Sequence, residues 1–424
     1  MTGALAADAL EFFRHGVAAA DPHDAVMHAL EVHDGEWSGH GKIHLVAAGK
    51  AALPMAEAAL SFLPATKIAS AFAVTNYENV RELPGLSVMG ASHPLPDENG
   101  ATAAKAIEDV AIRAGASDLV LCLISGGASA LLPAPADGIT LAEKTLANDL
   151  LLKSGADIVA MNTVRKVLSR LKGGGLARKI APAQGLALIL SDVPGDDLAI
   201  IASGPTVANN TPAARALAIV RSLGLEGAMP ETVMAHLKKR AGEPTEEFVQ
   251  TTENILVGSN RISLHATANS AARGGYETVI LSEWLEGDVA DAAKAFWKAA
   301  DTAEAGKPVA ILSGGETSVH VTGGGKGGRN QEMALRFAAL CRDRPLARDW
   351  AFLSGGTDGR DGPTDAAGGL VTPETLGAIE AAGKPVEEFL ADNDAYHALY
   401  AGDGLVMTGA TGTNVADLQV LLLR

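Results

Sequence analysis

The chain has 424 residues, a net charge of −16 at pH 7 and two cysteines. It is too long for a single core, and a hydrophobic content of 47% with only 4% aromatic residues is typical of an α/β enzyme of two or three domains. The negative charge argues against nucleic-acid binding, and two separated cysteines exclude a disulfide scaffold or a cysteine metal cluster.

The first twenty residues have the spacing of an amphipathic helix and carry Asp8 and Glu11, where a signal peptide would be basic and then apolar. No apolar run approaches the roughly 18 residues that a membrane helix needs. Together with the unpaired cysteines, these features predict a soluble protein of the reducing cytoplasm that has no membrane partner.

Strands and helices are then predicted to alternate along the chain. The apolar run IHLVAA ends at Gly49-Lys50 and is followed by an alanine-rich helix. Further strands are expected over 68–74, 119–124 and 185–191, and helices over 98–113, 140–154, 157–172 and 211–240. The polar stretch 241–247 is predicted to connect two domains, 1–242 and 243–424.

The second half repeats the alternation. Strands are expected at NILVGS, YETVIL, VAILS, SVHVT and WAFLS, and helices over 260–273, 288–305 and 330–342. This order predicts an α/β fold with mostly parallel sheets and right-handed crossovers. A ligand site is expected in a cleft between the two lobes.

Three apolar runs stop at Ser-Gly-Gly, ending at Gly127, Gly315 and Gly356. Such runs predict strands whose glycine loops turn sharply and expose backbone N–H groups to an anion. Glu316 and Asp358 follow two of these loops within two residues. Ordinary turns between strands and helices are the alternative interpretation.

Several basic residues could bind an anion. Lys50 stands at a strand-to-helix turn, where it can reach a phosphate or a carboxylate, although the Walker A pattern is absent. Asn162, Arg165 and Lys166 occupy adjacent turns of a predicted helix and could hold the same groups. Solvated lysines and a solvated basic helix face are the alternatives.

Carboxylates follow two predicted strands. Asp192 ends the strand at 185–191, where it could bind Mg²⁺, and Asp358, Asp361 and Asp365 lie in a glycine-rich loop. Each of these side chains could equally cap a turn.

The segment TGGGKGGRNQE at 322–332 lies between a predicted strand and a predicted helix. Gly323, Gly325 and Gly328 satisfy the dinucleotide fingerprint Gly-x-Gly-x-x-Gly, but no strand ending in an acidic residue follows about 20 residues later. Lys326 and Arg329 add two cations, which suit a triphosphate and a transferring phosphoryl group. The spacing therefore favours ATP over NAD.

These segments together resemble the class II glycerate 2-kinases, which have a MOFRL C-terminal domain. The matching segments are AAGKAA (47–52), SHPLPDENG (92–100), LISGGASALL (123–132), MNTVRKVLSRLKGGGLA (161–177), SDVPGDDLAIIASGPT (191–206), SGGETSVHVTGGGKGGRNQE (313–332) and SGGTDGRDGPTDAAGG (354–369).

The resemblance implies ATP-dependent phosphorylation of D-glycerate at its 2-hydroxyl, with a divalent metal ion. It also implies a Rossmann-like N-terminal domain that faces a smaller α/β domain, and Lys50 and Arg329 flanking the reaction centre. Some members carry the name hydroxypyruvate reductase, which makes an NAD(P)H-dependent reductase the alternative function.

The expected roles follow from the motifs and the resemblance together. Lys50, Arg329 and Asp192 are the expected catalytic residues, with Asp192 either a Mg²⁺ ligand or the base that receives the hydroxyl proton. The expected substrate-binding residues are Ser125, Gly126, Gly127, Asn162 and Arg165. The expected nucleotide-binding residues are Ser313, Gly314, Gly315, Glu316, Gly325, Lys326, Gly327, Gly328 and Asp358. D-glycerate, ATP and Mg²⁺ are the expected ligands, no nucleic acid is expected, and a homodimer is the candidate assembly.

Overall fold

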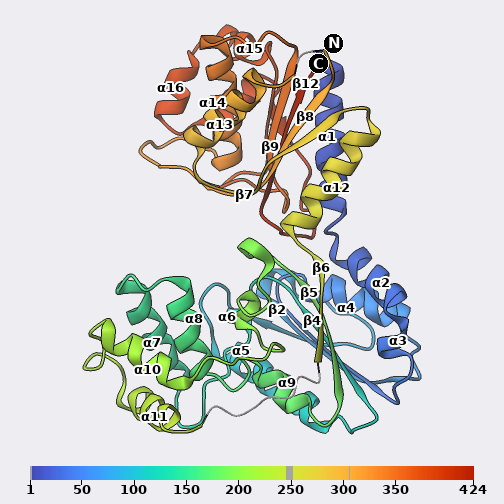
Figure 1. The fold of residues 1–424 in the computed structure, drawn as a ribbon, viewed down its shortest axis with the longest axis vertical. Helices are drawn as coiled ribbons and strands as arrows, with labels where there is room; N and C mark the ends of the chain where they lie inside the picture. The colour runs from blue at the N-terminus through green and yellow to red at the C-terminus, as the bar shows by residue number, and fades with distance from the viewer. Residues whose placement is uncertain (1, 245–251, 305) are drawn as a thin grey trace. The chain divides into compact units, whose positions relative to one another are not determined.

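A computed structural model describes residues 2–244, 252–304 and 306–424, which form two compact units (Figure 1). The N-terminal unit is Pro22–Val257, and the C-terminal unit combines Met1–Asp21 with Gly258–Arg424. These units differ from the expected division at 242/243 because the first helix packs in the C-terminal unit and the strand Thr252–Gly258 joins the sheet of the N-terminal unit. Residues 245–247 of the expected connection lie outside the described residues.

The N-terminal unit contains a six-stranded sheet in the order β3-β2-β1-β4-β5-β6. Its strands are β1 (Ile43–Ala48), β2 (Ile68–Asn76), β3 (Ser87–Ala91), β4 (Leu119–Ile124), β5 (Gln184–Leu190) and β6 (Thr252–Gly258). The pairs from β3 to β5 are parallel. Every residue of β4 is buried, as expected for a strand covered on both faces. This strand order is that of the Rossmann fold, so the predicted Rossmann-like domain is confirmed.

Helices cover this sheet and also form a cluster with its own core. The helices of this unit are α2 (Pro22–Val32), α3 (Asp34–Trp37), α4 (Ala52–Phe62), α5 (Glu98–Arg113), α6 (Ala128–Leu131), α7 (Leu141–Lys153), α8 (Ile158–Val167), α9 (Gly175–Ile180), α10 (Ala213–Ser222) and α11 (Glu231–Ala241). Apolar side chains of α7, α8, α10 and α11 pack together in a cluster beside the sheet (Figure 1).

Two helices expected in this unit are shorter than the sequence pattern suggests. The helix expected over 157–172 ends at Val167, ahead of the glycines at 173–175. The helical stretch expected over 211–240 is two helices, α10 and α11, separated by a segment that contains Gly224 and Pro230. Glycine and proline favour helix ends, which explains the break between α10 and α11.

The C-terminal unit has a six-stranded sheet in the order β11-β10-β9-β12-β8-β7. Its strands are β7 (Glu277–Asp288), β8 (Val309–Ser318), β9 (Trp350–Gly356), β10 (Gly368–Val371), β11 (Leu405–Val406) and β12 (Asp417–Leu423). Only β7 and β8 pair in parallel among the described strands of this unit, and the other four pairs are antiparallel. The expectation of a mostly parallel sheet is therefore wrong for this unit, because the last strand, β12, inserts between β8 and β9.

Helices lie on both faces of this second sheet (Figure 1). α1 (Thr2–Ala18) and α12 (Asn260–Arg273) pack on one face, and α13 (Val289–Asp301) and α14 (Arg329–Asp343) pack on the other. The short helices α15 (Thr375–Ala381), α16 (Val386–Ala391) and α17 (Ala395–Ala401) adjoin α14. The separate strand expected at SVHVT does not form, because β8 continues to Ser318 and no strand follows it there.

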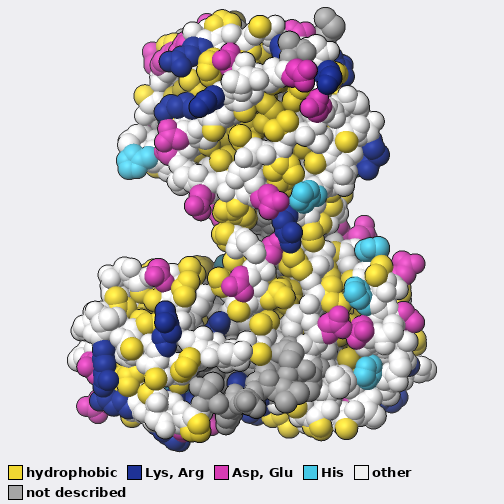
Figure 2. All heavy atoms as spheres, viewed as in Figure 1, with side chains coloured by type: hydrophobic (Ala, Val, Ile, Leu, Met, Phe, Trp, Pro, Cys, Tyr) yellow, Lys and Arg dark blue, Asp and Glu magenta, His cyan; other side chains and the backbone are white. Residues whose placement is uncertain are grey.

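The described helices include none that is both long and apolar enough to cross a membrane. Figure 2 shows basic and acidic side chains interspersed on the face in view.

Candidate active site

Two loops meet at the carboxyl ends of the adjacent strands β1 and β4. Gly49-Lys50 follows β1, and Ser125-Gly126-Gly127 follows β4. The Lys50 N–H donates to the Gly126 carbonyl at 2.9 Å, and the Ala51 N–H donates to Ser125 Oγ at 3.0 Å. After β1 the chain continues to β2, and after β4 it continues to β5, so the connections from these two adjacent strands run toward opposite edges of the sheet. Open α/β sheets bind their ligands at such a topological switch point.

The glycines of this site allow other groups to approach closely. A Cβ at Gly126 would overlap the Asp192 carboxylate. A Cβ at Gly127 would lie 3.3 Å from Lys50 Cγ and 3.1 Å from His93 Cδ2. The structure thus brings together Lys50, the Ser-Gly-Gly loop and Asp192, as the sequence predicted, and adds His93.

This site offers donors to an anion. The N–H groups of Gly126 and Gly127 make no hydrogen bond within the described part of the chain, and neither does the Lys50 ammonium. Burial, with the charge of Lys50 in addition, lowers the pKa of His93 and favours its neutral form. His93 stands in the segment SHPLPDENG, so the resemblance marked the segment without assigning the residue a role.

Asn162 and Arg165 take part in a second polar group, centred on Ser129 in α6. Arg165 Nη2 donates to Ser129 Oγ at 2.7 Å, and Ser203 Oγ donates to Asn162 Oδ1 at 3.2 Å. The two serine hydroxyls lie 3.3 Å apart. Lys172 Nζ also donates to Ser129 Oγ, at 2.6 Å.

Sequence reasoning missed three residues of this group, namely Ser129, Lys172 and Ser203. Ser129 lies only two residues beyond Gly127, so the second group is adjacent along the chain to the Ser-Gly-Gly loop. All three residues stand in segments that carry the family resemblance. Their position in those segments was the available signal.

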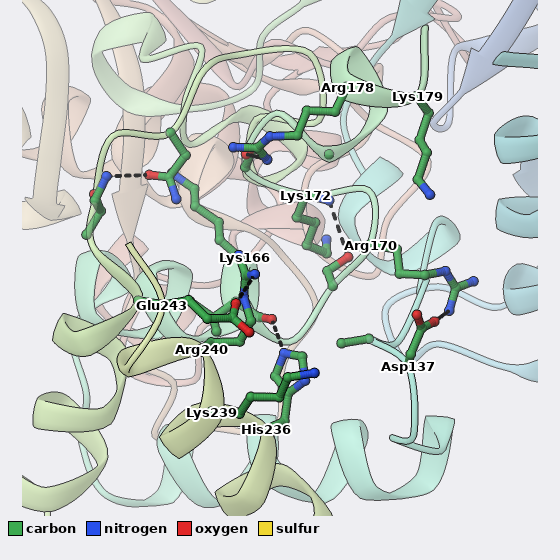
Figure 3. Close-up of a pocket in the computed structure, with 18 of the residues that line it drawn as sticks. Asp137, Lys166, Arg170, Lys172, Arg178, Lys179, His236, Lys239, Arg240 and Glu243 are labelled. Atoms are coloured by element: carbon green, nitrogen blue, oxygen red, sulfur yellow. Dashed lines mark hydrogen bonds and ion pairs between the residues drawn. The ribbon is translucent and has the colours of Figure 1, made fainter. Parts of the chain in front are cut away.

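A strongly basic cavity of about 420 Å³ lies next to this group (Figure 3). Side chains of α9 and α11 reach toward it from opposite sides, and Lys166 lies between them. Burial lowers the pKa of Lys166, so its side chain is not the fully solvated one of the alternative interpretation. The Lys and Arg residues that line the cavity are Lys166, Arg170, Lys172, Arg178, Lys179, Lys239 and Arg240. Although the chain has a net charge of −16, the positive charge of this cavity attracts anions locally.

The Ser-Gly-Gly segments of the C-terminal unit are not loops. Ser313, Gly314, Gly315 and Glu316 lie inside β8, and Ser354-Gly355-Gly356 ends β9 as paired strand residues. Their glycines admit neighbouring side chains, because a Cβ at Gly314 would overlap Asn260 and one at Gly355 would lie 2.8 Å from Phe13. The expectation of exposed anion-binding loops is wrong for these two segments.

Arg329 begins α14 and is bound by two carboxylates. Its Nε and Nη2 donate to Asp417 at 2.6 and 3.0 Å, and its Nη1 donates to Glu316 at 2.8 Å. Burial alone would lower the pKa of Arg329, but the bonds and charges of Asp417 and Glu316 outweigh it and raise the pKa. The Asp417 side chain is 1% exposed and that of Glu316 is 51% exposed. A phosphate could therefore replace Glu316 more easily than Asp417.

Asp361 holds the first turn of α14. Its carboxylate accepts from the Asn330 N–H at 3.1 Å and from the Gln331 N–H at 2.8 Å. Burial raises the pKa of Asp361 to about 6, although these hydrogen bonds oppose the shift. Asp358 accepts from the Arg360 N–H at 2.9 Å, as in the turn-capping alternative, and Asp365 accepts from the Tyr396 hydroxyl at 2.8 Å.

The glycine loop before α14 packs against the segment 392–394. The N–H groups of Gly324 and Gly325 donate to Asp392 at 2.9 and 2.8 Å, and that of Lys326 donates to Asp394 at 2.9 Å. Cβ atoms at Gly323 and Gly325 would overlap this segment, and one at Gly328 would overlap Asp361. Close packing thus accounts for the fingerprint spacing, and a nucleotide contact at Gly325, Lys326, Gly327 and Gly328 stays a prediction.

The residues around Asp192 fit a magnesium ion. Mg²⁺ typically takes one or two protein carboxylates and completes its shell with water and phosphate oxygens. Asp192 places one carboxylate against Gly126, next to backbone N–H groups and a cation that suit phosphate. The donor chemistry therefore suits Mg²⁺, and the role of Asp192 as ligand or as base stays open.

Comparison with known proteins gave matches over both halves of the chain. The family model "Domain of unknown function (DUF4147)" matches residues 8–238, and the model "MOFRL family" matches residues 309–417. A protein of Pyrococcus horikoshii named glycerate 2-kinase is 39% identical over 431 residues, covering 98% of this chain and 96% of that protein. A protein of Agrobacterium vitis, provisionally named hydroxypyruvate reductase, is 40% identical over 419 residues, covering 97% of this chain and 93% of that protein.

A solved structure is also closely similar. The crystal structure of glycerate kinase from Thermotoga maritima superposes with a TM-score of 0.91 at 36% identity and covers 100% of both chains. At this identity and coverage, the likeness extends to the whole arrangement of elements in each unit.

Proposed function

The chain belongs to the glycerate kinase family, in which a DUF4147 domain is followed by a MOFRL domain, and we propose that it transfers the γ-phosphoryl group of ATP to the 2-hydroxyl of D-glycerate. The products are 2-phosphoglycerate and ADP. The observation that carries the proposal is the site at the ends of β1 and β4, where Lys50 and the N–H groups of Gly126 and Gly127 stand next to the Asp192 carboxylate.

The acceptor is bound in the N-terminal unit. Arg165 and the Ser125–Gly127 loop hold the carboxylate of glycerate, and Asn162 fixes the network beneath it. The glycerate hydroxyl attacks the γ-phosphorus, the bond from that phosphorus to the bridging oxygen of ADP breaks, and the hydroxyl proton leaves to a base. Such transfer needs little covalent chemistry from the protein, so positioning and charge account for most of the rate.

The donor ATP is bound by the C-terminal unit. Lys326 and Arg329 supply positive charge to its phosphates, and Asp358 is a further proposed contact. Lys50 and Arg329 neutralise the charge that spreads over the transferring phosphoryl oxygens. Mg²⁺, when bound, supplies further neutralisation of the phosphate charge.

The test is one incubation of the protein with ATP, Mg²⁺ and D-glycerate, followed by identification of the products. We expect ADP and a phosphoglycerate to appear in equal amounts. The name of the Agrobacterium vitis relative supports a reductase as the second candidate. That candidate requires oxidation of NADH or NADPH by hydroxypyruvate, read as loss of absorbance, and such a loss without ADP formation would overturn the kinase proposal.

The position of phosphorylation is tested separately. A site that anchors the carboxylate can select the 2-hydroxyl by distance, because this hydroxyl is one carbon nearer than the 3-hydroxyl and transfer tolerates about 1 Å of misplacement. The product should therefore react directly with enolase. A signal that appears only after phosphoglycerate mutase is added would show phosphorylation at the 3-hydroxyl.

A further inference from the structure

Three basic side chains from separate parts of the N-terminal unit gather around Ser129. Arg165 from α8 and Lys172 both donate to its hydroxyl, at 2.7 and 2.6 Å. Lys172 also donates to the Ser129 carbonyl at 2.8 Å. Lys144 from α7 lines the same cavity and adds a third cation.

These cations lack the partners that buried charges normally have. Lys144 and Lys172 are 3% and 5% exposed, and no carboxylate pairs with Lys144, Arg165 or Lys172 among the described residues. Lys144 Nζ and Arg165 Nε are buried and make no hydrogen bond there. Buried or partly buried cations without a carboxylate partner are unfavourable, so the presence of three of them in one place indicates a role in binding rather than in stability.

The pKa shifts of these three side chains also indicate a binding role. Burial lowers the pKa of all three side chains, to about 7 for Lys144. The charge of Arg165 lowers the pKa of both lysines further. An anion placed among them would reverse these shifts by favouring the charged forms.

The cavity beside these cations has a volume of about 860 Å³. Asn148 Oδ1, a buried acceptor without a partner, lies on the same wall as Lys144. The acidic residues that line the cavity are Asp97, which caps α5 and binds the Tyr77 hydroxyl, Asp149, which pairs with Lys153, and Glu98 at the start of α5. Most of the remaining lining residues are apolar.

We propose that Lys144, Arg165 and Lys172 form a subsite for the carboxylate of the acceptor acid, and that Asn148 accepts a hydrogen bond from a hydroxyl of that acid. The inference rests on the proposed function and adds Lys144, Lys172 and Asn148 to its binding residues. The Ser129 hydroxyl oxygen accepts hydrogen bonds from Arg165 and Lys172, as an oxygen of a bound anion would. Ser129 follows Gly127 by two residues, so this subsite adjoins the Ser-Gly-Gly loop along the chain.

The test compares Lys144→Met and Lys172→Met with the wild-type protein. Binding of D-glycerate, ATP, glycerol and inorganic phosphate is measured by calorimetry, and the melting temperature is measured without ligand. Each variant should bind D-glycerate about 10- to 100-fold more weakly, as expected for the loss of one charged hydrogen bond. The melting temperature of Lys144→Met should be unchanged or higher, because the variant removes a buried charge without a partner. The control is Lys294→Met on α13, where the side chain is 63% exposed and lies outside the cavity.

The outcomes distinguish a carboxylate subsite from a different role for these lysines. Unchanged D-glycerate binding in both variants would overturn the proposal, as would equal weakening of ATP and D-glycerate binding. Wild-type binding of phosphate but not of D-glycerate would overturn it in favour of a phosphate subsite. If the wild-type protein binds D-glycerate through these lysines but transfers no phosphoryl group to it, the subsite stands and the proposed function fails.

Discussion

Lys50 and Arg329 share an expected role but have opposite surroundings. The Lys50 ammonium has no hydrogen bond within the described ranges, whereas Arg329 makes three bonds to two carboxylates. Lys50 is therefore ready to bind an anion, and Arg329 must exchange the Glu316 carboxylate for one. Substitutions at the two positions should differ in their effect on stability, although both should reduce activity.

Lys50→Ala should lower kcat by about 10²–10³-fold, the range for loss of one preorganised charge at a transition state. The melting temperature should stay the same, because no bond of the ammonium is lost. The measurement is steady-state kinetics with D-glycerate together with thermal unfolding. Lys105→Ala, which removes an exposed lysine paired with Asp109, is the control. Full turnover in Lys50→Ala would remove this residue from the reaction centre.

Arg329→Ala should lower kcat by a similar factor and also destabilise the C-terminal unit. Removing the guanidinium leaves Asp417 buried without its cation, which costs about 3–5 kcal/mol in comparable pairs. Denaturant unfolding measures this loss. In Arg329→Ala/Asp417→Asn, the neutral Asn should restore much of the stability without restoring kcat. Recovery of both quantities would indicate that Arg329 has only a structural role.

The stability of the N-terminal unit should rise with pH above about 7 because of Lys144. Its pKa is about 7 in the folded protein and near 10.5 in the unfolded chain. Between these values the unfolded chain keeps a proton that the folded protein has released, so the free energy of unfolding increases by about 1 kcal/mol per pH unit. Denaturant unfolding at pH 7, 8 and 9 should show a smaller slope for Lys144→Met than for the wild type. Equal slopes would mean that Lys144 is charged throughout this range.

At the scale of elements, the Ser-Gly-Gly triplet occurs in two kinds of local structure, a loop and a strand. Ser125-Gly126-Gly127 forms a loop after β4, but Ser313-Gly314-Gly315 continues β8 and Ser354-Gly355-Gly356 ends β9. The sequence around each run is similarly apolar, so periodicity could not separate them. The difference arises because β12 pairs with both β8 and β9 and keeps their glycines in strand pairing.

Gly126→Ala should inactivate the enzyme with little change in stability. The new Cβ would overlap the Asp192 carboxylate and displace it, and a displacement of about 1 Å can lower the rate about 10²-fold. Kinetics with D-glycerate measure the effect. Gly227→Ala is the matched control, because a Cβ there meets nothing within 4 Å. An active Gly126→Ala variant would show that the Asp192 position is not critical.

At the scale of the whole molecule, the first helix belongs to the unit formed by the last residues. Leu5, Ala9, Phe12 and Phe13 of α1 are buried in the core that α12 shares with the C-terminal sheet. The chain therefore passes between units at 21/22 and again at 257/258. A division of the sequence into two consecutive domains does not describe this arrangement.

Deletion of residues 1–21 should destabilise the C-terminal unit and leave the N-terminal unit folded. Each buried large apolar side chain contributes about 1.5–3 kcal/mol, so losing several removes much of the 5–15 kcal/mol typical of a domain. Hydrogen exchange should show lost protection in β8, β9 and β12 only. Glu11→Ala, an exposed change on the same helix, should have no such effect. Lost protection in β1 and β4 instead would contradict the assignment of α1.

The sequence by itself determined most elements of the N-terminal unit and predicted the residues that meet at its candidate site. Buried parallel strands are continuous apolar runs, so the bounds of the strand at 119–124 were predicted to the residue. Lys50 and Ser125–Gly127 directly follow the apolar runs of β1 and β4, so the sequence also showed that they lie in turns. The motifs also identified the family, because several long segments match it together.

Only the tertiary structure decided which groups are paired. The N–H groups of the glycine loop before α14 bind Asp392 and Asp394, and Arg329 binds Asp417, through contacts between residues more than 65 positions apart. Lys144 and Lys172 lie in the helices expected over 140–154 and 157–172, and only the tertiary structure shows that both side chains are buried. Sequence patterns report local periodicity and turn chemistry, whereas burial and pairing depend on which distant segments meet.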